Sequence, residues 1–256
     1  MLTIDFNCDM GEGMSSDEDI LPFVSSVNIA CGFHAGDMDT MRRTVGLALK
    51  YDVAIGAHPS YPDKENFGRT DCWGVSVDPG NLAGIITDQL GLLQKICEQS
   101  GARIHHVKPH GALYNRAARD RVVSNIIGQA ILAFDPMLIL YGLSGSEMKY
   151  AADRCGLHFI NEVFADRTYQ EDGSLTPRTL PGALIDNPAA AAAQVLTMIE
   201  EGIVVSLSGK KIRLTAETLC IHGDSKEAAR FALMIHSMLT KRGVFVRPPL
   251  ISEGGF

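Results

Sequence analysis

Short apolar runs, rich in β-branched residues, alternate along the chain with longer segments in which apolar residues recur at helical spacing. The short runs predict buried strands at residues 3–8, 26–31, 53–57, 103–107, 137–141, 158–163 and 218–221. The longer segments predict helices at residues 39–51, 81–100, 119–134, 146–155, 188–201 and 225–242. Strands and helices that alternate in this rhythm are typical of a parallel sheet.

Polar clusters directly follow nearly every predicted strand, at residues 7–12, 32–37, 56–59, 108–111, 162–167 and 222–224. In a barrel of alternating strands and helices, the carboxyl ends of all strands converge on one mouth. An open, doubly wound sheet would spread most of these clusters apart. The sequence therefore predicts an α/β fold, a TIM-like (β/α) barrel with about seven strands.

The composition is that of an ordinary folded enzyme. Of the 256 residues, 46% are hydrophobic and 21% are charged, which excludes a disordered chain. No repeat or linker divides the sequence, so we expect residues 1–256 to form a single catalytic domain. The formal net charge of -7 has the wrong sign for a general grip on phosphate backbones, and we expect no nucleic-acid partner.

The chain carries no targeting or membrane signal. Its first residues lack the basic and apolar segments of a leader, and no run of apolar residues is long enough to cross a bilayer. We therefore expect a cytoplasmic protein without a membrane partner. The six cysteines are scattered and form no CxxC pair, which predicts reduced thiols.

Three familiar catalytic motifs are missing. Gly209 and Lys210 lack the earlier glycine of a P-loop, because Val204 stands in its place. The sequence also contains no G-x-S-x-G elbow and no H-E-x-x-H motif. Hydrolysis by this chain would therefore depend on carboxylates, histidines, lysine or a metal.

The segment around Pro109 carries closely spaced basic residues. In an extended strand, His106, Lys108 and His110 share one face, which can be the barrel interior. A lysine inside a barrel needs a carboxylate or a substrate oxygen, because an unpaired buried ammonium is very costly. Lys108 and His110 are therefore either functional groups, or a structural ion pair and a helix cap.

Carboxylates and histidines also follow the first two strands. Asp9 and Glu12 are close enough to divide acid and base roles or to hold a cation, unless Asp9 only turns the chain. His34 lies three residues before Asp37, which fits either a site residue or the N-cap of the next helix.

His58 ends the third strand, where Pro59 forms a rigid junction that aims the imidazole at a fixed point. The barrel hypothesis predicts that one set of side chains converges on a single cavity at the carboxyl ends of the strands. This set is Asp9, His34, His58, Lys108 and His110.

Three loops carry further residues suited to anions. His222 and Asp224 precede a predicted helix, which they either cap or help to bind a phosphate at its N-terminus. Arg69 and Arg178 lie on loops rich in glycine and proline. A guanidinium fork there suits a carboxylate or phosphate, although solvated arginines are the commoner case.

Taken in order, these clusters resemble the LamB/YcsF lactam-utilisation family. The resembling stretches cover nearly the whole chain and lie at residues 7–12, 26–37, 56–63, 67–69, 107–115, 162–169, 172–178 and 220–224. Thr70 departs from the pattern, since the family has a second arginine at this place. The resemblance implies a distorted barrel related to glycoside hydrolases and deacetylases.

The resemblance also implies an activity. Family members serve as the A subunit of 5-oxoprolinase, which cleaves 5-oxo-L-proline to L-glutamate while ATP is hydrolysed to ADP and phosphate. The implied partners are the B and C subunits, with ATP shared among the three, and a small lactam as substrate. Because no nucleotide motif is evident, we expect activity to need these partners.

Roles for individual residues remain a hypothesis under this resemblance. Lys108 and Arg69 would steady the developing oxyanion and the phosphate. Asp9 or Glu12 would activate water, and His58 or His110 would move the proton. The candidates for binding substrate or phosphate are Asn28, His34, Asp37, Arg69, Glu162, Arg167, Arg178, His222 and Asp224.

A stand-alone, metal-dependent amidohydrolase or deacetylase is the competing hypothesis. In it, Asp9, His34 and His58 coordinate a divalent metal ion. Analogy of fold is weak support for a function. A non-catalytic scaffold for partner subunits fits poorly with six polar clusters at strand ends.

Overall fold

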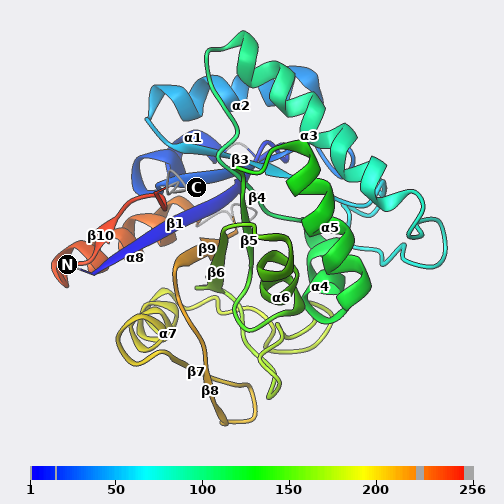
Figure 1. Cartoon of the computed structure of the whole chain (residues 1–256). Helices are drawn as coiled ribbons and strands as arrows, with labels where there is room; N and C mark the ends of the chain where they lie inside the picture. The colour runs from blue at the N-terminus through cyan, green and yellow to red at the C-terminus, as the bar shows by residue number, and fades with distance from the viewer. Residues whose placement is uncertain (1, 15, 223–227, 251–256) are drawn as a thin grey trace.

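The protein is described by a computed structural model that covers residues 2–14, 16–222 and 228–250. Its centre is a closed barrel of parallel strands, in which β9 pairs with both β6 and β1 (Figure 1). The barrel strands are β1 (Thr3–Met10), β2 (Ser26–Ala30), β3 (Ala54–His58), β4 (His106–Val107), β5 (Ile139–Leu143), β6 (Phe159–Phe164) and β9 (Thr218–Ile221). The predicted TIM-like barrel with about seven strands is confirmed.

Helices pack around the outside of this barrel. The predicted ones appear as α2 (Met38–Lys50), α3 (Leu82–Gln99), α5 (Arg121–Phe134), α6 (Glu147–Cys155), α7 (Pro188–Glu201) and α8 (Ala228–Lys241). In α5, Val123, Ile127 and Ile131 recur at a spacing of four and are buried against the core. The helical periodicity therefore predicted these elements correctly. Residues 225–227, the predicted start of α8, lie outside the described residues.

Several short elements were not visible in the sequence pattern. These are α1 (Asp17–Ile20), the 3-10 helix Leu21–Phe23, α4 (Gly111–Arg119), β7 (Ile203–Val205), β8 (Lys211–Arg213) and β10 (Phe245–Val246). A single residue separates α4 from α5, where Asp120 accepts hydrogen bonds from the amides of Val122 and Val123. This N-cap makes α5 begin at Arg121, two residues after the start predicted at residue 119.

The connection from β6 to β9 is the longest excursion from the barrel. It contains α7 and the antiparallel pair β7 and β8, which lie together below the barrel in the view of Figure 1. Arg167 is buried here, and its guanidinium donates to the backbone carbonyls of Thr176 and Ala183. These hydrogen bonds of Arg167 hold the segment between β6 and β9 together beside the barrel mouth.

The barrel interior is unusually polar. Along β1, the side chains of Asp5, Asn7 and Asp9 bond to residues of other strands, while Phe6 and Cys8 join the hydrophobic core. Interiors of this fold are ordinarily filled by branched apolar side chains. A continuous apolar layer therefore packs outside the strands, and polar groups from several strands meet inside.

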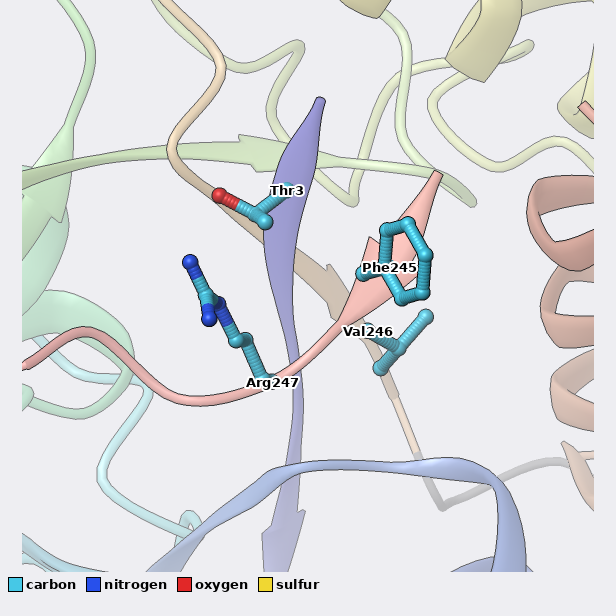
Figure 2. Close-up of a pocket in the computed structure, with 4 residues that line it drawn as sticks. All are labelled: Thr3, Phe245, Val246 and Arg247. Atoms are coloured by element: carbon cyan, nitrogen blue, oxygen red, sulfur yellow. The ribbon is translucent and has the colours of Figure 1, made fainter. Parts of the chain in front are cut away.

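At the opposite end of β1 from the polar clusters, the short strand β10 pairs with Thr3 and Ile4. A cavity of about 300 Å³ opens here, lined by Thr3, Phe245, Val246 and Arg247 (Figure 2). None of the predicted site residues that the structure describes lines this cavity. All six cysteines are free thiols, as predicted. None of the helices in the described ranges is long and apolar enough to cross a membrane.

Candidate active site

Four potential ligand side chains meet at the carboxyl ends of the first strands: Glu12, His34, His58 and His110. One ligand atom from each lies within 4.8 Å of all the others. The Nε2 of His34 is 3.1 Å from Glu12 Oε1, and the Nδ1 of His110 is 2.9 Å from the Nε2 of His58. Three loops and one strand end thus build a single compact cluster.

Backbone carbonyls fix the orientation of two of these rings. The Nδ1–H of His58 donates to the carbonyl oxygen of Lys108 at 2.7 Å. The Nε2–H of His110 donates to the carbonyl oxygen of Phe67 at 2.9 Å. The other nitrogen of each ring points into the cluster, toward Glu12 Oε1.

Burial keeps two of the imidazoles uncharged at neutral pH. Desolvation, followed by the charge of His58, lowers the pKa of His34 to about 3. Burial also lowers the pKa of His110 well below its ordinary value, with His58 and His34 as further causes. The His34 and His110 rings stack 3.8 Å apart and nearly parallel, at an angle of 6°. Both are therefore neutral bases whose lone pairs are available to a ligand.

Glycines let the loops close tightly around the rings. Gly68 has a positive φ of 64°, and a Cβ there would lie 2.8 Å from the His110 ring and 2.9 Å from the Cβ of His34. Gly111 has a φ of 52°, and its Cβ would lie 2.5 Å from the carbonyl oxygen of Gly68. Only glycine combines this conformation with this close approach.

Lys108 lies deeper, at the centre of a buried charge network. Its Nζ is 2.9 Å from Asp9 Oδ1 and 2.8 Å from Glu162 Oε1, and the side chain is 2% exposed. Its Nζ also contacts Asn7 Oδ1 at 3.2 Å and Cys220 Sγ at 3.0 Å. The ammonium is thus surrounded by partners from other strands, as expected for a structural ion pair.

These pairs decide the charge states in the network. Burial alone would lower the pKa of Lys108, but Asp9, Cys220 and Glu162 together raise it well above its ordinary value. Burial opposes the charge of Asp9 as well, yet His58 and Lys108 lower its pKa well below the usual range. Asp9 is therefore ionised. Its Oδ2 faces the cluster at 3.3 Å from His58 Nε2.

An amide and a further histidine extend this network toward the barrel base. Asn28 donates to Asn7 Oδ1 and Asp9 Oδ1, both at 2.8 Å, and its own oxygen accepts from His106 Nε2 at 2.8 Å. The His106 ring fits because Gly56 faces it, where a Cβ would lie 2.1 Å from the ring. Asn28 thereby holds Asp9 in place through contacts that reach across three strands.

Several members of this network had no role predicted from the sequence. Tyr114 donates to Glu162 Oε2 at 2.7 Å, and Asn7 donates to Glu162 Oε1 at 3.1 Å. The alternation of Asp5, Asn7 and Asp9 with apolar residues in one strand was the available signal. It indicates a polar inner face with period two.

The structure brings Asp9, His34, His58, Lys108 and His110 together at one end of the barrel, as predicted. The group able to hold a metal differs from the predicted set. Asp9 engages Lys108 and Asn28, and Glu12 and His110 complete the group with His34 and His58. The turn at Gly11, which has a φ of 75°, aims Glu12 back over the mouth.

Other predicted residues lie outside this cluster. Asp37 caps α2, since its side chain accepts from the Thr40 amide at 2.8 Å. Arg167 binds backbone carbonyls of the excursion, so neither side chain reaches the histidines. Asp224 lies outside the described residues.

The remaining candidates lie around the network. His222 Nδ1 is 2.9 Å from Asp166 Oδ2, and its ring stacks on Phe164. Arg178 acts electrostatically on Asp166, and the Arg69 guanidinium lies 5.0 Å from the centre of the Phe67 ring.

The sequence profile of the LamB/YcsF family matches residues 4–252. The chain belongs to this family. It is 48% identical over 257 residues to the 5-oxoprolinase A subunit of Geobacillus kaustophilus (strain HTA426), covering 99% of both chains. It is also similar to the crystal structure of a lactam utilization protein from Thermus thermophilus. That match has a TM-score of 0.89 and 39% identity, covering 96% of this chain and 99% of the other.

The fold extends to more distant proteins. The peptidoglycan deacetylase PdaC from Bacillus subtilis superimposes with a TM-score of 0.51 at 15% identity, over 96% of this chain and 87% of that one. At this identity the likeness concerns the fold alone. It agrees with the predicted deacetylase-like barrel fold.

Proposed function

We propose that this chain is the A subunit of an ATP-dependent 5-oxoprolinase. It would open the lactam ring of 5-oxo-L-proline to L-glutamate while ATP becomes ADP and phosphate, in a complex with the B and C subunits. The observation that carries this proposal is the 48% identity, over 99% of both chains, to a relative named for that role. The buried polar site at the barrel mouth supplies groups suited to such chemistry.

Coupling to ATP makes chemical sense for this substrate. A lactam is a resonance-stabilised amide, and its carbonyl carbon is a poor electrophile. Transfer of a phosphoryl group to the carbonyl oxygen would leave ADP and create an activated carbon. One water adds there, the ring C–N bond breaks as the nitrogen takes a proton, and a second water releases phosphate from the resulting acyl phosphate.

Within this proposal, Asp9 is the carboxylate best suited to accept a proton from water. Lys108 and Asn28 hold its Oδ1, and its Oδ2 remains directed at the cluster. A general base needs both a fixed position and a free lone pair. His58, 3.3 Å from Asp9 Oδ2, or His110 beside it would relay the proton that Asp9 takes from water to the leaving nitrogen, and Glu12 completes the reaction centre.

Lys108 takes a positioning role in this proposal. Its two carboxylate partners already neutralise it, so it orients Asp9 and Glu162 and stabilises negative charge at short range. Arg69, Arg178 and His222, which lie around the network, remain our proposed contacts for the substrate carboxylate and for phosphate.

The test is reconstitution of the full chain with its partner subunits. We expect ADP and glutamate to form in equal amounts, only when 5-oxo-L-proline and the complete set of partners are present. Asp9→Asn should lower this turnover by about 10² to 10⁴. Asp39→Asn, an exposed carboxylate on α2, is the matched control and should leave it unchanged. Full ATP-coupled activity of the chain alone would contradict the need for partners.

The group formed by Glu12, His34, His58 and His110 favours a second candidate, a stand-alone metal-dependent amidohydrolase. This enzyme would cleave an amide without ATP. Glutamate formation by the isolated chain in the absence of ATP would support it over the multi-subunit enzyme.

A further inference from the structure

In the cluster of Glu12, His34, His58 and His110, neutral imidazoles do not have enough N–H protons for all of their close contacts. A carbonyl oxygen can only accept a hydrogen bond, so His58 Nδ1 and His110 Nε2 must both carry their protons toward Lys108 and Phe67. A neutral imidazole has one N–H. The two inner nitrogens, His58 Nε2 and His110 Nδ1, face each other at 2.9 Å, and a proton lies between them only when one ring carries a second proton.

Glu12 adds further lone pairs to the same point. Its Oε1 lies 3.4 Å from His110 Nδ1 and 4.0 Å from His58 Nε2. The side chains are nearly excluded from solvent, with Glu12 9% exposed and His58 1% exposed. Electron-rich atoms at these separations repel one another unless a positive centre lies among them.

The charges of the neighbouring network do not supply this positive centre. The ammonium of Lys108 is 2.9 Å from Asp9 and 2.8 Å from Glu162, so two carboxylates already share it. A divalent cation among the inward lone pairs would compensate the negative charge that gathers at the mouth.

We infer that Glu12, His34, His58 and His110 form the binding site of one divalent transition-metal ion of the zinc class. Three imidazole nitrogens and one carboxylate oxygen are typical donors for zinc, whereas calcium and magnesium prefer oxygen. Metal bonds of about 2.0–2.1 Å in a tetrahedron separate the ligand atoms by roughly 3.3 Å. Four of the six separations are 2.9, 3.1, 3.4 and 4.0 Å, which bracket this value, and all six lie within 4.8 Å.

The second layer of contacts fits a metal site as well. Metal-binding histidines donate their outer N–H to a carbonyl or carboxylate, which fixes the tautomer and the ring plane. His58 and His110 each have such a carbonyl. His34 is the exception, because its buried Nδ1 has no hydrogen-bond partner among the described residues, while its Nε2 is directed at Glu12. When bound, such an ion would polarise a carbonyl group or lower the pKa of a water molecule.

Metal titration of the full chain, purified without an affinity tag and stripped by a chelator, tests this inference. Zn²⁺ should bind at one ion per chain and raise the melting temperature. Co²⁺ should produce the visible absorption of a four- or five-coordinate ion with nitrogen ligands. Both readouts are independent of 5-oxo-L-proline and ATP, so failure of this inference and failure of the proposed function are distinguishable.

Single substitutions identify the ligands. His110→Ala and Glu12→Gln should each weaken Zn²⁺ binding by at least about 100-fold, beyond the effect of typical outer-layer changes. His158→Ala, which removes an exposed histidine, should leave binding unchanged. Circular dichroism of the metal-free variants separates loss of a ligand from loss of the fold.

Two results would overturn the inference. One is an absence of stoichiometric binding, with nitrogen NMR showing a proton shared between His58 and His110. The other is binding that survives both His110→Ala and Glu12→Gln, because the ion would then be adventitious.

Discussion

The Lys108 network and the histidine cluster are neighbours in one barrel mouth but differ in how their polar groups are satisfied. Lys108 contacts Asp9, Glu162, Asn7 and Cys220, so its charge has partners on several strands. In the cluster, His58 Nε2 and His110 Nδ1 instead face each other at 2.9 Å, while the outer N–H of each ring is already donated to a backbone carbonyl. The difference teaches that a buried network whose polar groups all have partners stabilises the fold. A cluster whose polar groups lack partners can instead bind a ligand.

The largest expected effect comes from breaking the satisfied network. Lys108→Met would leave Asp9 and Glu162 buried without their cation. Removal of one partner from a buried ion pair typically lowers the free energy of unfolding by about 3–5 kcal/mol. Denaturant unfolding should detect this loss, while Lys95→Met, at an exposed position on α3, should change stability little. If Lys108→Met instead left the free energy of unfolding unchanged but abolished turnover, Lys108 would be a purely catalytic residue.

A smaller loss should follow from crowding the lower part of the same network. In Gly56→Ala the new Cβ would lie 2.1 Å from the His106 ring. This ring cannot move freely, because it stacks on Tyr141 at 4.0 Å and bonds to Asn28. We expect a loss of about 1–3 kcal/mol in unfolding free energy. Gly46→Ala in α2, with open space around its Cβ, should be neutral or slightly stabilising.

Acid should weaken the network through His106. Burial, with His105 and Lys108 as further causes, lowers the folded-state pKa of His106 well below 6.5. Below about pH 6.5, His106 is therefore protonated in the unfolded chain but stays neutral in the folded chain. This contribution to stability is present above pH 6.5 and is lost as the pH falls, by up to about 1.4 kcal/mol per pH unit.

Urea unfolding at pH 7.5 and at pH 5.5 measures this slope. His106→Gln keeps an amide donor for Asn28 but cannot titrate, so its unfolding free energy should fall less between the two pH values. An identical slope for both proteins would assign the acid sensitivity to other groups.

The smallest effect on stability is expected in the histidine cluster. His110→Gln removes one inward lone pair from a crowded point, and the unfolding free energy of the metal-free chain should change by less than about 1 kcal/mol. Turnover of the reconstituted complex should nevertheless fall by about 10² to 10⁴. His158→Gln serves as the exposed control. Normal turnover of His110→Gln would remove this residue from the proposed reaction centre.

The fold was largely predictable because each barrel strand carries its own local pattern. Thr218–Ile221 was predicted with its observed bounds, and α7 was predicted over the observed Pro188–Glu201. The pair β7 and β8 was missed because each strand has three residues, too few for a period to be visible. The helix α4 was missed because Gly111, a poor helix former, is its first residue.

The closeness of the candidate residues was predictable, but their pairings were not. Polar residues at strand ends were enough to predict that Asp9, His34, His58, Lys108 and His110 lie at the same end of the barrel. The polar inner face of β1 was equally present in the sequence, as Asp5, Asn7 and Asp9. The sequence could not predict which residues pair with these side chains, because the partners come from distant parts of the chain.

The sequence by itself determined the order of strands and helices, the position of the barrel mouth and the residue types gathered there. These follow from local periodicity and from the rule that parallel strands end on the same side. Only the tertiary structure decided that Asp9 pairs with Lys108, 99 residues away, while Glu12 joins the three histidines. The reason is physical: strand register and loop closure set distances of a few ångströms, and these distances decide which charge neutralises which.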